Sequence, residues 1–533
     1  MAKAKVITYA NDRYKGSLTD KQCEILERII DLDSKNGYVA DLKHCIKNIP
    51  ESTAQTFVEE MDNFNHQYTQ FEVPIGELRD EQTLGTAFMY AAKSCILGDT
   101  VGLGKTVQVS GLLNLLESDA KKAIEAGTRP ANRPFRFLYL TEKNLIAQTR
   151  LELVRFTGNF IDMVSSEAKP CSNFFSYYEM GKTLEYSIIA GHSLLNQPIF
   201  FSWFLSTCSY NGFNPFDILI IDESSVVGNL KSGITQNLLS ISSKFDRIIF
   251  LNATPFESKL DVFYSQLHIL DPAMLPVKTN FQKQYVVFDY RGMRPRPTNK
   301  YKNAEDFRKK VGYRYFARTR EEKGAVMEDC TGRVIVSPLS KVQKEWLGKT
   351  SMPQMVFDCP NYFDSSIEFN FENVPKLQSL KEALEQDCED ADTILIYVRH
   401  LEAQNSICDW LTANGYSNKK LNGETKKIDR DDIIKGFRNQ EYKVLVTNVQ
   451  KGLNFGNCNY CIFYGFDPNP NKMVQFEGRI TRSFDIIDKH VVVLCSEGKE
   501  FKRFNEVIKR RAEASSKFSK ADISCIMSIL LGD

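Results

Sequence analysis

The sequence predicts an α/β protein in which parallel sheets are covered by helices on both faces. Short apolar runs typical of buried strands alternate with stretches whose apolar residues recur at helical spacing. The second half of the chain repeats this alternation, with strands expected at 393–397 and 443–447 and a helix at 401–410. A chain of 533 residues is too long for one hydrophobic core and suggests about three or four domains.

The composition excludes several classes of protein. Hydrophobic residues make up 42% of the chain and charged residues 25%, as in an ordinary folded protein. Because no run of about 18 apolar residues and no signal-peptide core is present, we expect no membrane contact and a cytoplasmic location. The net charge of +1 excludes no partner, since a nucleic acid needs only a local basic groove.

The 13 cysteines are scattered, and in a chain without an export signal we expect reduced, mostly buried thiols. Cys458 and Cys461 form the one close pair. They do not predict a zinc site, because no second pair follows at the usual spacing and the surrounding apolar residues favour a strand.

The N-terminal residues 1–70 carry two or three helical patterns, among them 21–32 and 49–64. We expect a small helical module there, either a packing appendage or a surface for a protein partner. A longer helix is expected to begin at Leu78-Arg-Asp-Glu-Gln82. The amide of Gln82 carries both a donor and an acceptor, so it could form two hydrogen bonds with adenine.

The strongest motif is Gly98-Asp-Thr-Val-Gly-Leu-Gly-Lys-Thr106, which follows the predicted strand 94–97 and precedes an apolar-periodic helix. A strand, a glycine-rich turn and a helix in this order are the setting of a phosphate-binding loop. Backbone N–H groups and the helix N-terminus would hold the β- and γ-phosphates, Lys105 would add a charge, and the Thr106 hydroxyl would hold Mg²⁺. Asp99 stands where the strict template has glycine, and a turn that binds nothing is the alternative.

Downstream of this helix we expect a polar connection at 117–133, a strand at 135–140 and a helix at 141–156. Thr141 is a plausible N-cap for that helix. The helix should turn an apolar face inward, formed by Leu145, Leu151 and Val154.

Two carboxylates follow another buried strand in Phe216-Asp-Ile-Leu-Ile-Ile-Asp-Glu-Ser-Ser225. Open parallel sheets place ligand-binding groups at this end of a strand. Asp222 would hold the metal, and Glu223 would orient or deprotonate an attacking water. Two surface acids are the alternative for the pair alone. The next predicted strand, 247–251, leads to Thr254, whose hydroxyl could sense the γ-phosphate and relay its presence.

The segment 291–320 is strongly basic and contains Glu305 and Asp306 as its acids. Tyrosines are interleaved with its lysines and arginines, which would suit a nucleic-acid backbone, and a solvated linker is the alternative. The candidate nucleic-acid contacts are Arg308, Lys309 and Lys310. A second basic run, 499–520, contains enough glutamates to predict an amphipathic helix instead.

Taken in order, these motifs resemble those of the Swi/Snf type of superfamily-two helicase-like ATPases. Asp99-Thr-Val-Gly-Leu-Gly-Lys-Thr106 is similar to the family's Asp-Glu-Met-Gly-Leu-Gly-Lys-Thr, which also carries aspartate at this place. Asn252-Ala-Thr-Pro-Phe and Leu267-His-Ile-Leu-Asp-Pro272 resemble its Gly-Thr-Pro-Leu and Leu-Asn-Phe-Leu-Asp-Pro. Phe316-Ala-Arg-Thr-Arg320 resembles its Leu-Arg-Arg-Thr-Lys segment. The resemblance extends from about residue 78 to residue 482.

The second half carries the rest of the family signature. Leu421-Asn-Gly-Glu-Thr425 resembles its Leu-Asp-Gly-Ser-Thr turn, and Lys451-Gly-Leu-Asn-Phe455 resembles its Gly-Leu-Asn-Leu segment. Gln475-Phe-Glu-Gly-Arg-Ile-Thr-Arg482 supplies the closing Gln-x-x-Gly-Arg-x-x-Arg pattern.

The two arginines of the closing pattern are three residues apart, which places both on one face of a helix. Arg479 and Arg482 could therefore stabilise the charge of one transferring phosphoryl group, with Gln475 aligning them. A solvated basic helix face is the alternative. The chain departs from the family pattern at two places: Ser225 stands in place of histidine, and Thr481-Arg-Ser-Phe-Asp485 in place of His-Arg-Ile-Gly-Gln. These changes concern the coupling between the ATP state and DNA contact more than the phosphate chemistry.

The resemblance implies two RecA-like lobes, to which the sequence patterns above add an N-terminal helical module and a helical, basic insertion between the lobes. We expect these boundaries: module 1–70, first lobe 71–275, insertion 276–371, second lobe 372–512 and tail 513–533. It also implies ATP and Mg²⁺ as cofactors. The nucleotide contacts implied by the matching motifs are Arg79, Gln82, Gly102, Leu103, Gly104, Lys105, Thr106, Gly452 and Asn454.

The activity implied by the resemblance is ATP-driven translocation along double-stranded DNA, blind to sequence, by a monomer. One rival is a helicase that separates strands, processes branched DNA or displaces a stalled polymerase. A rival of another class is a nucleotide-gated DNA-binding scaffold with little hydrolysis. Because no chromatin-reading domain or nuclease is recognisable, we expect a bacterial or viral origin.

Overall fold

The computed structural model describes residues 78, 80–99, 103–157, 163–166, 187–253, 260–290, 295–317, 330–449, 458–466, 473, 476 and 489–514. The chain divides into two compact units. The first comprises Met1–Ala325 with Ala514–Asp522, and the second Val326–Glu513 with Ile523–Asp533.

The first unit is built on a seven-stranded sheet in the order β3-β4-β2-β5-β6-β1-β9, in which each pair of neighbours is parallel. The apolar runs that predicted strands form the centre of this sheet. Its strands are β1 (Cys95–Leu97), β2 (Phe137–Thr141), β3 (Met163–Ser166), β4 (Ser187–Gly191), β5 (Ile218–Asp222), β6 (Ile248–Leu251) and β9 (Tyr315–Phe316).

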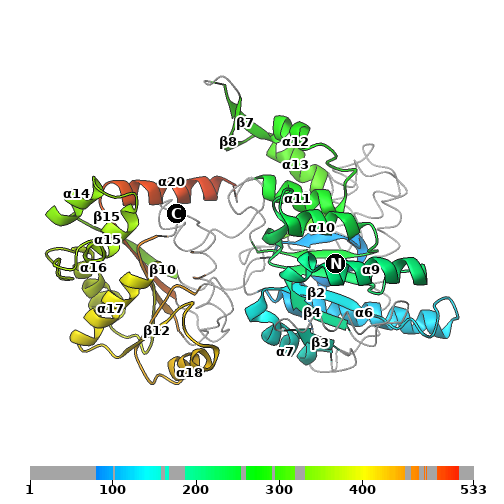
Figure 1. The fold of residues 1–533 in the computed structure, drawn as a ribbon, viewed down its shortest axis with the longest axis horizontal. Helices are drawn as coiled ribbons and strands as arrows, with labels where there is room; N and C mark the ends of the chain where they lie inside the picture. The colour runs from blue at the N-terminus through cyan, green and yellow to red at the C-terminus, as the bar shows by residue number, and fades with distance from the viewer. Residues whose placement is uncertain are drawn as a thin grey trace, which may run out of the picture. The chain divides into compact units, whose positions relative to one another are not determined.

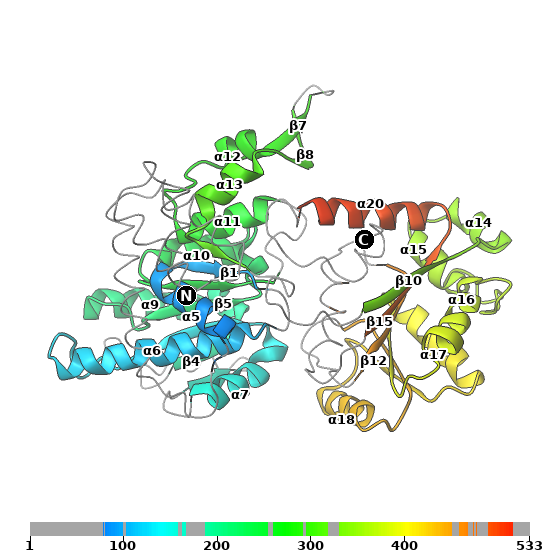
Figure 2. The same ribbon diagram turned by 180° about the vertical axis from the view of Figure 1, so that it is seen from behind.

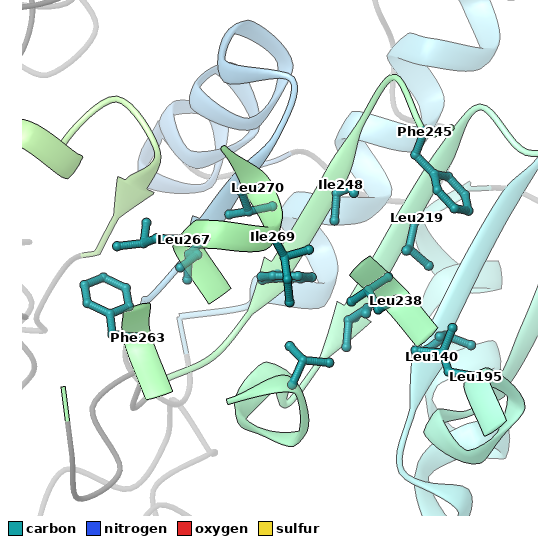
Figure 3. Close-up of a cluster of buried hydrophobic side chains, with 14 of the residues drawn as sticks. Leu140, Leu195, Leu219, Leu238, Phe245, Ile248, Phe263, Leu267, Ile269 and Leu270 are labelled. Carbon is teal, nitrogen blue, oxygen red and sulfur yellow. The ribbon is translucent and has the colours of Figure 1, made fainter. Parts of the chain in front are cut away.

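Helices cover both faces of this sheet, and side chains on alternate strand positions fill a hydrophobic core on each face. On one face lie α5 (Asp80–Ala92), α6 (Lys105–Glu125) and α7 (Ile146–Thr157), side by side in Figure 2. On the other lie α9 (Pro198–Asn211), α10 (Gly233–Ser242) and α11 (Leu260–Leu270). Figure 3 shows Leu238 of α10 and Leu267 of α11 among the buried side chains on this face. Short 3₁₀ turns complete the unit: η1 (Lys143–Leu145), η2 (His192–Asn196) and η3 (Ser224–Val227).

A two-stranded antiparallel hairpin extends from the first unit. It is formed by β7 (Val286–Asp289) and β8 (Arg296–Tyr301), between α12 (Lys278–Tyr285) and α13 (Ala304–Val311). Figure 1 shows it projecting beyond these two helices, away from the parallel sheet.

The second unit is built on a six-stranded parallel sheet in the order β10-β15-β14-β11-β13-β12. Its strands are β10 (Cys330–Ser337), β11 (Ile394–Tyr397), β12 (Asn418–Leu421), β13 (Val444–Thr447), β14 (Tyr460–Tyr464) and β15 (Lys489–Ser496). Its helices are α14 (Lys341–Leu347), α15 (Pro353–Asp358), α16 (Lys376–Glu382), α17 (Leu401–Ala413), α18 (Lys427–Arg438) and α20 (Lys499–Ala514), with short turns η5 (Pro360–Tyr362) and η6 (Ala383–Asp387). The parallel α/β class predicted for both halves is therefore confirmed.

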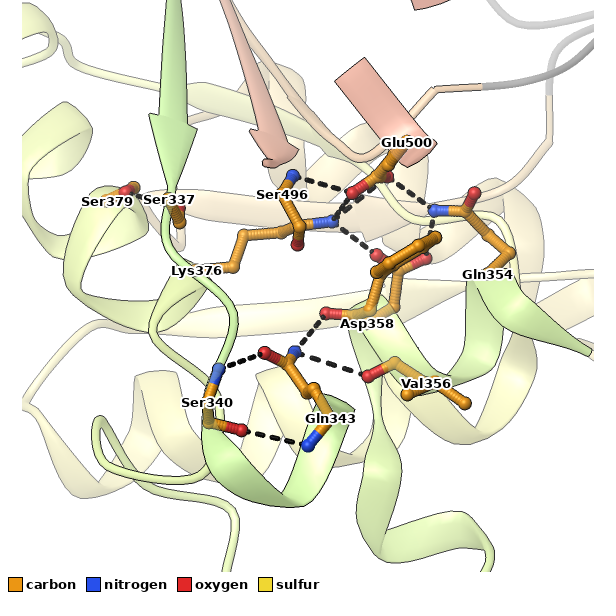
Figure 4. A network of polar contacts seen from close by, with 11 residues as sticks. Ser337, Ser340, Gln343, Gln354, Val356, Asp358, Lys376, Ser379, Ser496 and Glu500 are labelled. Atoms are coloured by element: carbon orange, nitrogen blue, oxygen red, sulfur yellow. Dashed lines mark hydrogen bonds and ion pairs between the residues drawn. The ribbon is translucent and has the colours of Figure 1, made fainter. Parts of the chain in front are cut away.

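A buried ionic network joins three helices of the second unit (Figure 4). The Lys376 ammonium lies 2.7 Å from Asp358 Oδ1 and 2.9 Å from Glu500 Oε2, and all three side chains are shielded from solvent. Gln354 Nε2 donates to both carboxylates, at 2.9 Å to Asp358 and 2.7 Å to Glu500. The backbone N–H of Ser496 donates to Glu500 at 2.7 Å. These contacts tie α15, α16 and α20 together.

Several local predictions differ from the structure. The segment 276–371, expected as one helical insertion, is divided near residue 325: the part through β9 joins the first unit, and β10 with the following helices joins the second. It also contains strands as well as helices. The helix α6 continues to Glu125, through much of the expected polar connection. None of the described helices combines the length and apolar character needed to cross a membrane.

Thr141 is not the N-cap that its position suggested. It is the last residue of β2, and the helix it was expected to cap begins later, after the η1 turn. Its side chain is buried in the sheet instead of facing the first turn of a helix. The module expected at 1–70 lies outside the described residues, as does the tail expected at 513–533 apart from residues 513 and 514, which end α20.

Candidate nucleotide site

The glycine-rich loop lies where the sequence placed it, between the end of β1 and the start of α6. Gly104 precedes α6 with φ 74° and ψ 45°, a left-handed conformation that favours glycine. A β-carbon there would lie 2.5 Å from Gln82 Nε2. Glycine is thus needed at this position both for its backbone conformation and for the close approach of Gln82.

Asp99, which departs from the strict template, has a structural partner. Its buried carboxylate accepts a hydrogen bond at 2.9 Å from Gln108 Nε2, on the first turn of α6. The same amide donates to Leu103 O at 3.3 Å, and Lys105 Nζ donates to Asp99 O at 2.8 Å. Gln108 thus joins both ends of the loop, a role that the sequence did not reveal, because the only signal was a polar residue on an otherwise apolar helix face.

Gln82 lies against the loop backbone. It is 5% exposed, and its Nε2 is 3.5 Å from Leu103 O. Thr86, one turn further along α5, has its hydroxyl 2.9 Å from both Gln82 O and Gln108 O. The start of α5 therefore packs on the loop and on α6, and the adenine contact expected of Gln82 stays a prediction.

The acidic pair lies at the same edge of the sheet as the loop. β6 is hydrogen-bonded between β5 and β1, in a register that aligns Asp222 with Leu251 and Leu251 with Leu97. The backbone N–H of Asn252 donates to Leu97 O at 3.1 Å. The carboxyl ends of three neighbouring strands thus bring the phosphate loop, the acids and the segment leading to Thr254 together.

The charges at this edge perturb one another. Burial and, after it, the adjacent Glu223 carboxylate raise the pKa of Asp222, the nearby Lys105 ammonium opposes both, and the net result is a pKa of about 7. Glu223 adopts φ 49° and ψ 52°, a strained conformation for a residue with a side chain, and its N–H donates to Asp222 Oδ1 at 2.9 Å. Because a nearby positive charge favours the ionised form of a buried carboxylate, binding a cation would stabilise Asp222 in its charged state.

The oxygen atoms available here fit Mg²⁺. A threonine hydroxyl at the start of α6 and a carboxylate at the end of β5 are hard ligands of the kind this cation takes, and few protein ligands suffice because substrate phosphates and waters complete its shell. Thr106 and Asp222 would therefore hold the ion.

Two further contacts around the acids were not predicted. His192 Nε2 lies 2.7 Å from Asp222 O, and the Ser224 hydroxyl donates to Gln266 Oε1 at 3.0 Å. The second contact joins the acidic strand end to α11, and both of its side chains are buried. Neither could be found from spacing, because the partners are far apart in sequence and belong to no shared motif.

The basic segment is partly structural. The Arg314 guanidinium binds Asp271 Oδ2 at 3.2 Å and the carbonyl oxygens of Ala92 and Ser94 at 2.8 and 3.0 Å. Tyr315, expected to interleave with exposed cations, is 5% exposed and belongs to the core. These two residues are therefore not nucleic-acid contacts, since Arg314 joins Asp271, which follows α11, to the connection between α5 and β1, and Tyr315 fills the core.

Other members of the basic segment do face solvent. Arg296, Lys302 and Lys310 are exposed, and Tyr290 is 74% exposed. Lys310, in α13, was among the predicted contacts. Arg296 lies in β8, Lys302 between β8 and α13, and Tyr290 directly after β7.

Most of the remaining predicted site residues lie outside the described part of the chain. These are Arg79, Gly102, Thr254, Gly452, Asn454, Gln475, Arg479 and Arg482, together with the side chains of Arg308 and Lys309.

A glycine-rich phosphate loop with an acidic strand end beside it, in the first of two parallel-sheet units, defines a nucleotide-binding protein of the P-loop class. Residues 22–402 match the family described as the SNF2-related domain, and residues 375–484 match the helicase conserved C-terminal domain. The chain belongs to the SNF2-related family.

Among curated relatives, the chain is 24% identical to the Danio rerio chromodomain-helicase-DNA-binding protein 1-like over 423 residues, covering 73% of this chain and 38% of that protein. It is 20% identical to Homo sapiens DNA repair and recombination protein RAD54B over 563 residues, covering 87% and 59%. The chain thus spans about two fifths to three fifths of these relatives' lengths. The Sulfolobus solfataricus SWI2/SNF2 ATPase core in complex with dsDNA aligns with a TM-score of 0.39 and 20% identity, covering 87% of this chain and 97% of that one.

Proposed function

We propose that this chain is an ATP-dependent motor of the Swi/Snf type that moves along double-stranded DNA. The observation that carries the proposal is the meeting of loop and acids at one sheet edge, with Lys105 close enough to Asp222 to lower its pKa. Phosphoryl transfer requires a loop that binds the phosphates, a cation that neutralises their charge, and carboxylates at a neighbouring strand end.

The proposed roles follow from the geometry. Lys105 neutralises phosphate charge, and Gly104 lets the loop backbone approach the phosphates closely. Glu223 positions the attacking water and takes its proton. Thr106 and Asp222 would hold Mg²⁺, which when bound would supply positive charge at the phosphates. Arg479 and Arg482, with Gln475, would stabilise the transferring phosphoryl group, and Thr254 would transmit the nucleotide state.

The exposed cations on the β7–β8 hairpin and α13 support a DNA backbone as the track. Phosphate contacts carry no base information, so recognition should be blind to sequence. We further propose a monomer that acts in the cytoplasm. The bacterial or viral source expected from the sequence gains no support from the relatives above, which come from animals.

An ATPase titration with duplex DNA, single-stranded DNA, branched DNA and RNA tests the proposal, with Lys105→Ala as the control for contaminating activity. We expect duplex DNA to stimulate turnover most. Equal turnover with and without every nucleic acid would overturn the motor, and the highest stimulation by branched or single-stranded DNA would favour a helicase that separates or processes strands.

A further inference from the structure

Tyr139, in the middle of β2, has a fully buried hydroxyl. This hydroxyl has no hydrogen-bond partner among the residues that the structure describes. An unsatisfied buried hydroxyl carries a desolvation cost, and such groups in native proteins call for an explanation. A phenylalanine would fill the same space without that cost.

The sheet register directs this side chain toward the nucleotide site. Tyr139 is aligned with Ile220 in β5, two residues before Asp222, and side chains two apart on a strand share a face. That face is covered by α6, whose first turn carries Thr106. The tyrosine ring therefore extends between β5 and α6, toward the edge where the proposed metal ligands lie.

The polar neighbours of the hydroxyl agree with this placement. Burial raises the pKa of Tyr139 well above its ordinary value, the charges of Asp222 and Glu152 raise it further, and Thr106 lowers it. A phenolic hydroxyl can donate a hydrogen bond to a carboxylate. The Tyr139 hydroxyl lies close enough to the Thr106 hydroxyl and the Asp222 carboxylate for a contact with each to shift its pKa, although neither contact has the geometry of a full hydrogen bond.

We propose that Tyr139 is a positioning residue for the metal–nucleotide site, whose hydroxyl donates to the Asp222 carboxylate once the cation is bound. One oxygen of Asp222 would then accept from Tyr139, and the other would remain available as a metal ligand. This inference rests on the proposed nucleotide site, and it adds a residue outside the motifs that predicted that site. Outer-shell hydrogen bonds of this kind typically change metal affinity by about 10- to 100-fold.

The test compares Tyr139→Phe with wild type in the full chain. Mn²⁺ affinity is measured by electron paramagnetic resonance in the presence of a non-hydrolysable ATP analogue, and analogue affinity is measured separately without metal. We expect Tyr139→Phe to weaken Mn²⁺ binding by about tenfold or more, without changing metal-free analogue binding. Equal Mn²⁺ affinity would overturn the proposal and leave Tyr139 as a core residue.

Tyr464→Phe is the matched control. Tyr464 lies in β14 of the second unit, and its buried hydroxyl likewise has no hydrogen-bond partner among the described residues. Its removal should leave Mn²⁺ affinity unchanged, and an equal loss in both variants would contradict a specific role for Tyr139.

A second measurement keeps the inference separate from folding and from the proposed function. In the background Asp222→Ala, which removes the acceptor, adding Tyr139→Phe should cause no further loss of Mn²⁺ affinity; an additive loss would overturn the contact. Thermal unfolding of each variant reports any loss of structure. Failure of the proposed function would appear in wild type itself, as an absence of metal-dependent analogue binding, whereas failure of this inference leaves wild-type binding intact.

Discussion

Replacing Lys376 with methionine should strongly destabilise the second unit. Methionine has a similar shape but no charge, so Asp358 and Glu500 would remain buried beside each other without the cation that lies between them. Removing one partner of a buried ion pair costs about 3–5 kcal/mol. Donors from Gln354 and the Ser496 backbone still reach the carboxylates, so we expect a loss toward the lower end of that range.

The direction of the pH dependence follows from the Glu500 carboxylate. Burial already raises the pKa of Glu500 in wild type, and Lys376 opposes the rise. Without the lysine, the pKa of Glu500 in the folded variant should lie still further above its value in the unfolded chain. The folded variant would then take up protons first as the pH falls, so its deficit in stability relative to wild type should shrink toward acid pH.

Urea unfolding followed by tryptophan fluorescence can measure this. The chain has 3 tryptophans, and substituting Trp203 with phenylalanine in all variants leaves Trp346 and Trp410, which report on the second unit. The matched control is Lys349→Met, at an exposed ion pair with Glu345, where we expect a change of less than about 1 kcal/mol. If Lys376→Met proved as stable as the control, the reasoning from burial would be refuted.

The other predictions concern the proposed activity. Lys105→Ala should lower ATP turnover by roughly 10²-fold or more, since a preorganised charge is lost at the phosphates; unchanged turnover would remove Lys105 from the site. Glu223→Gln should bind ATP but hydrolyse it slowly, as seen by nucleotide retention in a filter assay, and rapid hydrolysis would exclude its role as base. Neutralising Arg308, Lys309 and Lys310 together should weaken DNA binding and flatten its salt dependence; identical salt slopes in a titration would show that they do not contact phosphates.

The parts predicted well from sequence are those in which local order determines geometry. The strands that lead to the loop and to the acidic pair are short apolar runs, followed by glycines in one case and by carboxylates in the other. In an α/β chain, a short apolar run of this kind usually forms a buried strand. The loop itself ends at Gly104, whose positive φ is a property of the residue type. Because neighbouring parallel strands end at the same edge of a sheet, the proximity of the loop and the acidic pair could be predicted from the sequence.

The parts predicted poorly depend on distant partners. Arg314 looked like one more cation in a basic segment, yet Asp271 and two carbonyl groups of the α5–β1 connection hold it. Thr141 had the residue type of a helix cap but was incorporated into β2. Tyr139 looked like an ordinary strand residue, and only the register of β2 against β5 shows that it approaches Asp222.

The hydrogen bond between Asp99 and Gln108 implies that these two positions should vary together in evolution. Restoring the template glycine at Asp99 would remove one acceptor of the Gln108 amide, so a natural sequence that makes the first change should tend to alter the second. Searches that treat each position of the glycine-rich motif independently would score such chains too low, whereas a search that weights this pair jointly would recover them.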